Sequence, residues 1–150
     1  MTPHVELSRI ARDGAVVDHA GPLPDGVRQN CEMTAKYYAG AGFVPPWIGY
    51  VAVANGTVVG NGGFTGAPQD GRVEIAYYTV PALEGRGYAT GTARALIAVA
   101  RKADPTLLIV ARTLPMTNAS TAILRKLGFA HAGTVSTPDD GDVWEWHLRV

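Results

Sequence analysis

The apolar positions in the first half of the chain follow two different periods. Between residues 25 and 42 they recur every three or four residues, as they do along one face of an α-helix. The segments 47–54 and 57–64 are instead rich in β-branched and other apolar residues, and they flank Asn55-Gly56, a pair typical of a tight hairpin turn. With a shorter apolar run at 5–10, this half predicts one helix among antiparallel strands.

In the second half, strand and helix patterns alternate. An apolar strand at 73–80 leads through a glycine-containing turn into an alanine-rich helix that begins near Ala89 and ends at Asp104-Pro105. The run 107–111 is apolar without interruption, which is typical of a strand buried on both faces. A strand, a crossover helix and a buried strand predict a βαβ unit whose two strands are parallel.

A short helix and a hairpin are expected to close the chain. Asn118 or Thr117 can cap the helix. Its inward side is predicted to include Ala122, Ile123 and Leu127. The hairpin joins strands at 134–137 and 143–148 across a turn rich in proline, aspartate and glycine.

The length indicates a single domain over residues 1–150, and the order of strand and helix patterns predicts an α/β fold with a mixed, mostly antiparallel sheet of six to seven strands flanked by helices. A chain of this size buries roughly 70% of its unfolded surface. The formal net charge of zero predicts neither a nucleic-acid partner nor a membrane partner. Cys31 is the only cysteine, and no apolar run approaches the ~18 residues of a membrane span, so we expect a cytoplasmic protein.

The turn between residues 80 and 90 carries the clearest chemical signal. Gly85 and Gly87 flank Arg86 just before the alanine-rich helix. Glycine lets the main chain approach an anion without a Cβ in the way, and the N–H groups and dipole at a helix N-terminus attract negative charge. A phosphate group is therefore expected here. No Gly-Lys-Ser/Thr follows the turn, which argues against ATP.

Two motifs together resemble the acetyl-CoA-binding signature of the GNAT N-acetyltransferases. The first is EGRGYAT at 84–90, after the strand VEIAYYTV, and the second is TLPMTNASTAILRKLGF at 113–129. The second motif and the closing GDVWEWHL are similar to ribosomal-protein N-terminal acetyltransferases of the RimJ/RimL type. The resemblance implies a GNAT fold whose sheet splays between its fourth and fifth strands. It also implies direct transfer of an acetyl group from acetyl-CoA to a primary amine.

The resemblance further implies where acetyl-CoA binds. The pantetheine would pair with backbone groups of Tyr78, Thr79 and Val80. The pyrophosphate would lie on the N–H groups of Gly85, Arg86, Gly87, Tyr88, Ala89 and Thr90. Asn118 resembles the family's cofactor-contacting asparagine, or it is only the helix cap. Glu84 departs from the family's pattern, which usually has Gln or Arg there, and its carboxylate would mildly repel a diphosphate.

Glu74 and Ser120 are the residues that we expect to take part in the chemistry. A lysine-type amine, with a pKa of ~10.4, is almost wholly protonated at pH 7, so acetyl transfer needs a base. Glu74 matches a catalytic glutamate of several GNAT members; otherwise it is a strand residue paired with Arg72 or a neighbour. Many members place a proton-donating tyrosine where this chain has Leu124. Ser120 would then donate to the leaving thiolate or contact the cofactor, or it makes only a local helix bond.

Aromatic residues upstream of the turn are expected to form the acceptor pocket, although most of them would also suit a core. We expect Tyr37, Trp47 and Phe64 to contact the substrate, a small-molecule or peptide amine. A metal site is not expected, because the histidines and Cys31 show no ligand spacing. The oligomeric state is expected to be monomer or homodimer. The alternative function is a non-catalytic acyl-CoA-binding or sensing module on the same fold.

Overall fold

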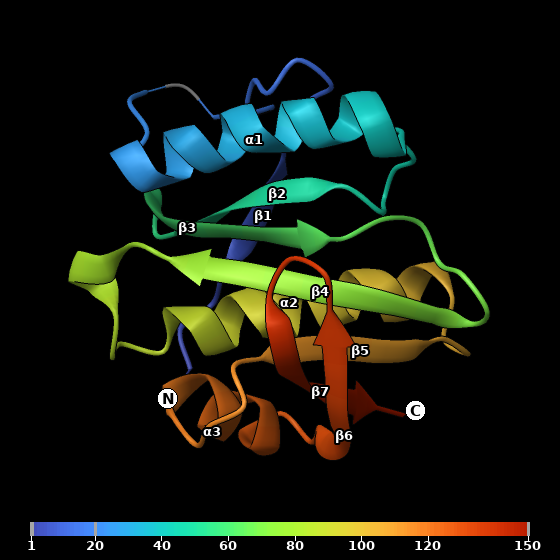
Figure 1. Ribbon diagram of the computed structural model, residues 1–150. Coiled ribbons are helices and arrows are strands. Elements are labelled where there is room, and N and C mark those ends of the chain that lie inside the picture. The colour runs from blue at the N-terminus through green and yellow to red at the C-terminus, as the bar shows by residue number, and fades with distance from the viewer. Residues whose placement is uncertain (1, 20, 150) are drawn as a thin grey trace.

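The computed structural model describes residues 2–19 and 21–149, in which seven strands form one mixed sheet with helices on both faces (Figure 1). The elements are β1 Glu6–Arg9, α1 Asp25–Ala41, β2 Gly49–Ala54, β3 Thr57–Phe64, β4 Arg72–Thr79, η1 Pro81–Leu83, α2 Tyr88–Ala103, β5 Leu108–Thr113, α3 Ala119–Lys126, β6 Ala130–Thr137 and β7 Gly141–Leu148. None of the described helices is long and apolar enough to cross a membrane.

The sheet has the strand order β1-β2-β3-β4-β5-β7-β6. Among the described strands, β4 and β5 form the one parallel pair, so the predicted βαβ unit β4-α2-β5 is confirmed. The predicted hairpin between β2 and β3 is also confirmed. Its two turn residues, Asn55 and Gly56, have φ of 50° and 77°, as the tight turn requires.

Helices α1 and α2 cover opposite faces of the sheet (Figure 1). On β3, Asn61 is hydrogen-bonded to Asn30 of α1, whereas a Cβ at the next position, Gly62, would lie 3.0 Å from Leu96 of α2. Successive residues of a strand point to opposite faces, so the two helices lie on different sides. The largest buried side chains of the core are Trp146, Ile10, Ile48, Ile75, Leu96, Ile109 and Leu124.

Helix α1 begins at Asp25, whose carboxylate lies 3.2 Å from the guanidinium of Arg28. Helix α3 differs from its prediction in one detail. In α3 the buried side chains are Thr121 and Leu124, whereas Ala122, predicted to face inward, is exposed. The prediction was therefore wrong for Ala122, whereas Leu127, also predicted to face inward, packs against the core.

The parallel strands β4 and β5 pair only where they begin. Their register runs from Arg72 opposite Leu108 to Glu74 opposite Val110. Beyond Glu74, β4 continues to Thr79 with β3 as its partner in the described chain. The predicted splay between the fourth and fifth strands is thus present, and it opens a gap beside the end of β4.

Candidate active site

The turn after β4 presents main-chain N–H groups at the start of α2. Gly85 and Gly87 have φ of 77° and 87°, the left-handed region that favours glycine. The first bond of α2 runs from the N–H of Gly91 to the carbonyl of Gly87, over 3.0 Å. The three N–H groups before it have no partner inside the helix and can bind an anion. They belong to Tyr88, Ala89 and Thr90.

A cleft of about 480 Å³ adjoins this turn, within the size range of small-molecule sites. We call it the α2–α3 cleft, because the first turn of α2 and one side of α3 form two of its walls. It is lined by Tyr77, Thr79, Leu83, Glu84, Gly85, Gly87, Tyr88, Ala89, Thr90, Ala119, Ser120, Ala122 and Ile123. The small apolar side of α3 faces this cleft instead of the core, which explains the error in the prediction for Ala122.

Six of the ten residues predicted to bind the cofactor line the α2–α3 cleft: Thr79, Gly85, Gly87, Tyr88, Ala89 and Thr90. Ser120, one of the two predicted catalytic residues, lines it as well. The other four predicted cofactor residues lie outside this lining: Tyr78, Val80, Arg86 and Asn118.

Backbone pairing explains why Thr79 reaches the cleft and its two neighbours do not. The N–H of Val80 donates to a carbonyl of β3 over 2.9 Å, and the carbonyl of Tyr78 points at Gly60 of β3. Backbone groups of successive residues in such a strand point to opposite sides. Those of Tyr77 and Thr79 therefore point away from β3, toward the gap left by β5.

Asn118 serves as the helix cap in this structure. Its Oδ1 accepts the N–H of Thr121 over 3.1 Å, and the Thr121 hydroxyl accepts the N–H of Asn118 over 3.0 Å. These two bonds satisfy donors that the helix start would otherwise leave open. Ser120 is left as the hydroxyl that α3 presents to the cleft.

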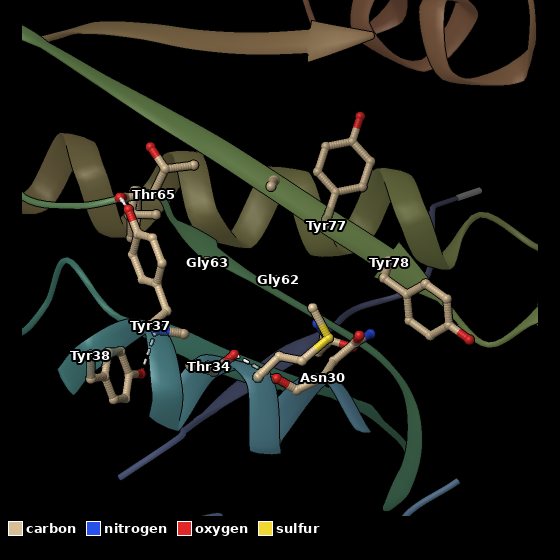
Figure 2. Close-up of a pocket in the computed structure, with 14 residues that line it drawn as sticks. Asn30, Thr34, Tyr37, Tyr38, Gly62, Gly63, Thr65, Tyr77 and Tyr78 are labelled. Atoms are coloured by element: carbon tan, nitrogen blue, oxygen red, sulfur yellow. Dashed lines mark hydrogen bonds between the residues drawn. The ribbon is translucent and has the colours of Figure 1, made fainter. Parts of the chain in front are cut away.

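A second cavity, of about 490 Å³, lies between α1 and the strands β3 and β4 (Figure 2). We call it the α1 pocket. It is lined by Asn30, Met33, Thr34, Tyr37, Tyr38, Gly49, Asn61, Gly62, Gly63, Phe64, Thr65, Ala76, Tyr77 and Tyr78. Tyr77 lines both cavities, so the α1 pocket and the α2–α3 cleft share one residue of β4.

Of the three predicted acceptor residues, the structure brings Tyr37 and Phe64 to the α1 pocket. The hydroxyl of Tyr37 donates to the carbonyl of Thr65 at the pocket wall. Trp47 lies outside the lining, and its ring packs edge-on against Phe64 with centroids 5.1 Å apart. Its place in the structure is therefore behind the pocket wall.

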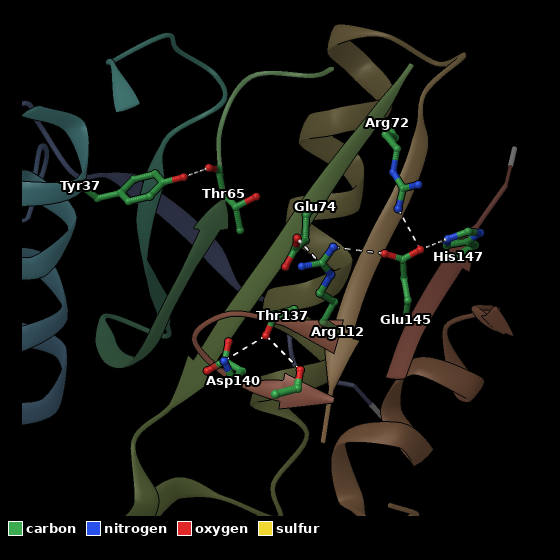
Figure 3. Close-up of polar contacts among 10 residues, drawn as sticks. Tyr37, Thr65, Arg72, Glu74, Arg112, Thr137, Asp140, Glu145 and His147 are labelled. Atoms are coloured by element: carbon green, nitrogen blue, oxygen red, sulfur yellow. Dashed lines mark hydrogen bonds and ion pairs between the residues drawn. The ribbon is translucent and has the colours of Figure 1, made fainter. Parts of the chain in front are cut away.

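Glu74 belongs to a charged cluster that spans β4, β5 and β7 (Figure 3). Its Oε1 lies 3.7 Å from Nε of Arg112. Glu145 contacts three basic side chains, Arg72 at 2.9 Å, Arg112 at 3.4 Å and His147 at 2.8 Å. Arg72, which the sequence offers as a partner for Glu74, is thus engaged by Glu145. Across residues 2–19 and 21–149, no three His, Cys, Asp or Glu side chains are grouped to hold a metal ion.

Burial and charge act in opposite directions on these carboxylates. Burial raises the pKa of Glu74 above its ordinary value, more than the cations of Arg112 and Arg72 lower it, and Glu145 raises it further. For Glu145, burial also acts to raise the pKa, but hydrogen bonds from His147 and Arg72 outweigh it and hold the pKa low. The two carboxylates therefore differ in basicity, and Glu74 is the one suited to accept a proton.

Reasoning from the sequence missed several members of these sites, among them Tyr77, Arg112, Glu145 and His147. Burial raises the pKa of Tyr77 to about 12, so its phenol keeps its proton at neutral pH. For β7, the available signal was the alternation of side chains along the strand. Trp146 is fully buried, so its neighbour Glu145 must point to the opposite face of the sheet. The strand order that brings this face to β4 was not visible in the sequence.

The site thus combines a splayed pair of central strands, an anion-binding turn beside it and a second pocket across β4. A family model described as an acetyltransferase (GNAT) domain matches residues 3–130, and the chain belongs to this family. It is accordingly a GNAT acetyltransferase, the family that the two sequence motifs resemble.

Solved structures of other acetyltransferases share this fold at low sequence identity. RimL, a ribosomal L7/L12 α-N-protein acetyltransferase in complex with coenzyme A, is 14% identical with a TM-score of 0.69, over 98% of this chain and 94% of that chain. The yncA protein of Salmonella typhimurium, with its cofactor acetyl-CoA, is 20% identical with a TM-score of 0.64, over 97% and 93%. RimJ of Mycobacterium smegmatis, in complex with a CoA-disulfide, is 22% identical with a TM-score of 0.62, over 81% and 60%. No curated protein matches the chain in sequence.

Glu84 is expected to weaken coenzyme A binding. Its exposed carboxylate lines the α2–α3 cleft beside the turn, where it repels a diphosphate. Replacing Glu84 with glutamine should tighten coenzyme A binding about two- to fivefold at low salt, and the gain should fade toward 1 M salt as screening grows. Titration calorimetry at two salt concentrations measures this, with Glu32→Gln on α1 as the control of equal charge. Equal affinities for the two variants would contradict the expectation.

Proposed function

We propose that the acetyl group passes from acetyl-CoA, bound in the α2–α3 cleft, directly to a primary amine that enters through the α1 pocket. The observation that carries this proposal is that Tyr77 lines both cavities where β4 has left β5. Reactants bound on either side of this point would meet, and positioning of this kind supplies a large part of catalysis.

Features of the α2–α3 cleft support coenzyme A as its ligand. The N–H groups at the start of α2 suit a pyrophosphate, and Gly85 and Gly87 keep Cβ atoms away from it. The unpaired side of β4 at Tyr77 and Thr79 offers backbone groups to the amides of pantetheine. When bound, acetyl-CoA supplies the activated acetyl thioester. Arg86, exposed on the turn, adds a positive charge nearby.

We assign removal of the amine proton to Glu74. Alternation along β4 puts Glu74 on the same face as Ala76, which lines the α1 pocket. Its raised pKa makes it a stronger base than an ordinary glutamate, and Arg112 holds its carboxylate in place. The proton would reach Glu74 directly or through a water molecule.

Of the five hydroxyl-bearing residues that line the α2–α3 cleft, we consider two as proton donors to the leaving thiolate: Ser120 of α3 and Tyr77 of β4. The position where many GNAT members carry the donating tyrosine is the fully buried Leu124, which faces the core. A donor must therefore come from another position. We assign this role to Ser120, with Tyr77 as the second donor.

Replacing Ser120 with alanine should lower kcat about fivefold or more, or weaken coenzyme A binding by a similar factor, which is the ordinary contribution of one hydrogen bond. Alanine suits this exposed helical position, so the fold should be unaffected. Steady-state kinetics and calorimetry separate the two effects. A wild-type kcat together with wild-type affinity would reduce Ser120 to local structure.

The proposed function is tested by following thiol release from acetyl-CoA with a panel of primary amines and by confirming the acetylated product by mass spectrometry. Turnover that needs both reactants supports direct transfer. Tight coenzyme A binding without turnover on any amine would instead favour the sensing module. We place the activity in the cytoplasm, because the single cysteine is free and buried, and we expect a monomer or homodimer.

A further inference from the structure

The lining of the α1 pocket carries no charge. Among its fourteen residues, all within the described chain, there is no Asp, Glu, Lys, Arg or His. The first charged side chain along β4 beyond Ala76 is Glu74, the proposed base. A carboxylate or a second ammonium group that entered the pocket would lose water without gaining a partner of opposite charge, which is unfavourable.

Two amide side chains cross the pocket from α1 to β3. Nδ2 of Asn30 donates to Oδ1 of Asn61 over 2.9 Å, and both residues line the pocket. In the described part of the chain, this is the one hydrogen bond that either side chain makes. Each amide has two N–H donors and one oxygen acceptor. The pair therefore leaves Nδ2 of Asn61 as a free donor and Oδ1 of Asn30 as a free acceptor.

The mouth of the pocket is apolar. Met33 and Tyr37 lie one turn apart on α1, and their residues are 65% and 50% exposed. Exposed apolar side chains gathered at a cavity mark a surface for a ligand with an apolar part. A donor and an acceptor held side by side beneath this mouth match the carbonyl and N–H of an uncharged amide.

We propose that Asn61, held by Asn30, is a specificity-determining residue that selects amines bearing an uncharged amide over free amino acids and polyamines. This inference rests on the proposed function and names its acceptor class. Amino-acid amides and peptides with a neutral first residue both carry this group. Free amino acids present a carboxylate in its place, and polyamines present a second cation.

The test compares leucinamide, leucylglycinamide, leucine and spermidine as acceptors for the wild-type protein and for Asn61→Asp. The aspartate keeps the oxygen that accepts from Asn30 and replaces the free donor with a negative charge. We expect kcat/KM for the two amides to fall about tenfold while that for spermidine rises, because an unsatisfied polar group is penalised by this order. Each amine's own reactivity cancels in the ratio of variant to wild type. Equal kcat/KM values for leucinamide and leucylglycinamide show that the protein recognises the first amide of the acceptor. A higher kcat/KM for leucylglycinamide than for leucinamide indicates that the acceptor is a longer peptide.

Asn55→Asp is the matched control, since it makes the same change in the β2–β3 turn outside the pocket. It should leave the order of acceptors unchanged, and neither variant should alter the affinity for coenzyme A. The specificity role of Asn61 would be wrong if Asn61→Asp lowered kcat/KM for all four acceptors by the same factor. It would also be wrong if the wild-type protein acetylated leucine or spermidine as efficiently as leucinamide. In both cases the acetyltransferase function would still stand. Absence of turnover with every amine would overturn the proposed function and this inference together.

Discussion

Replacing Glu74 with glutamine is expected to lower the acetylation rate at pH 7 by about a hundredfold, the lower end of what a positioned base contributes. Glutamine keeps the shape of the side chain but cannot take up a proton. The rate should recover as the pH approaches the amine's own pKa, because the amine then loses its proton to solvent. The measurement is kcat/KM between pH 5.5 and 10, with coenzyme A affinity measured in parallel and expected to be unchanged.

In the wild-type protein, the acid limb of this profile should report Glu74. A base works only when deprotonated, so the rate falls as the pH drops through its pKa. Burial raises that pKa, and the limb should therefore lie above the range of an ordinary glutamate. Glu32→Gln on the surface of α1 controls for the loss of one charge. A profile for Glu74→Gln that overlays the wild type would remove Glu74 from the mechanism.

The neighbours of Glu74 provide a sharper form of this test. Arg112 lowers the pKa of Glu74, so Arg112→Met should move the acid limb to higher pH. Glu145 raises it, so Glu145→Gln should move the limb to lower pH, and Arg72 and His147 would keep their places beside the new amide. Opposite shifts from two variants of one cluster are not expected from general loss of structure. Shifts in one direction would show that the limb belongs to another group.

The anion-binding turn could be predicted from the sequence because its determinants are local. Gly85 and Gly87 are needed for their own backbone angles, and the N–H groups that they expose belong to the residues that follow at once. The same holds for the Asn55-Gly56 hairpin. Short-range sterics decide such features, and a single stretch of chain contains all the information.

The walls of the two cavities could not be predicted in this way. Asn30 and Asn61 are 31 positions apart, and only the packing of α1 on β3 brings their amides together. The cluster around Glu145 needs three strands, of which β7 enters the sheet between β5 and β6. The apolar pattern of α3 predicts a side that faces the core, although part of that side lines the α2–α3 cleft. A core and a cleft both favour small apolar residues, so the pattern cannot distinguish the two environments.

Gly60→Ala is the substitution with the largest expected effect on stability. A Cβ at Gly60 would collide with the carbonyl oxygen of Tyr78 and come within 3.0 Å of the Cα of Thr79. Both obstacles are backbone atoms, so no side chain can rotate out of the way. We expect the free energy of unfolding to fall by about 1–3 kcal/mol, the usual result of overpacking, and the midpoint of thermal unfolding to fall by several degrees.

Gly40→Ala is the control for this prediction, because the same methyl group meets no atom within 4 Å on the surface of α1. In a helix, this change is neutral or stabilises by up to about 1 kcal/mol. Urea unfolding of both variants measures the difference, and equal stabilities would show that β3 and β4 can separate at no cost. Because Thr79 lines the α2–α3 cleft, Gly60→Ala should also weaken coenzyme A binding, whereas Gly40→Ala should not. A loss of stability without a loss of affinity would mean that the end of β4 does not hold the cofactor.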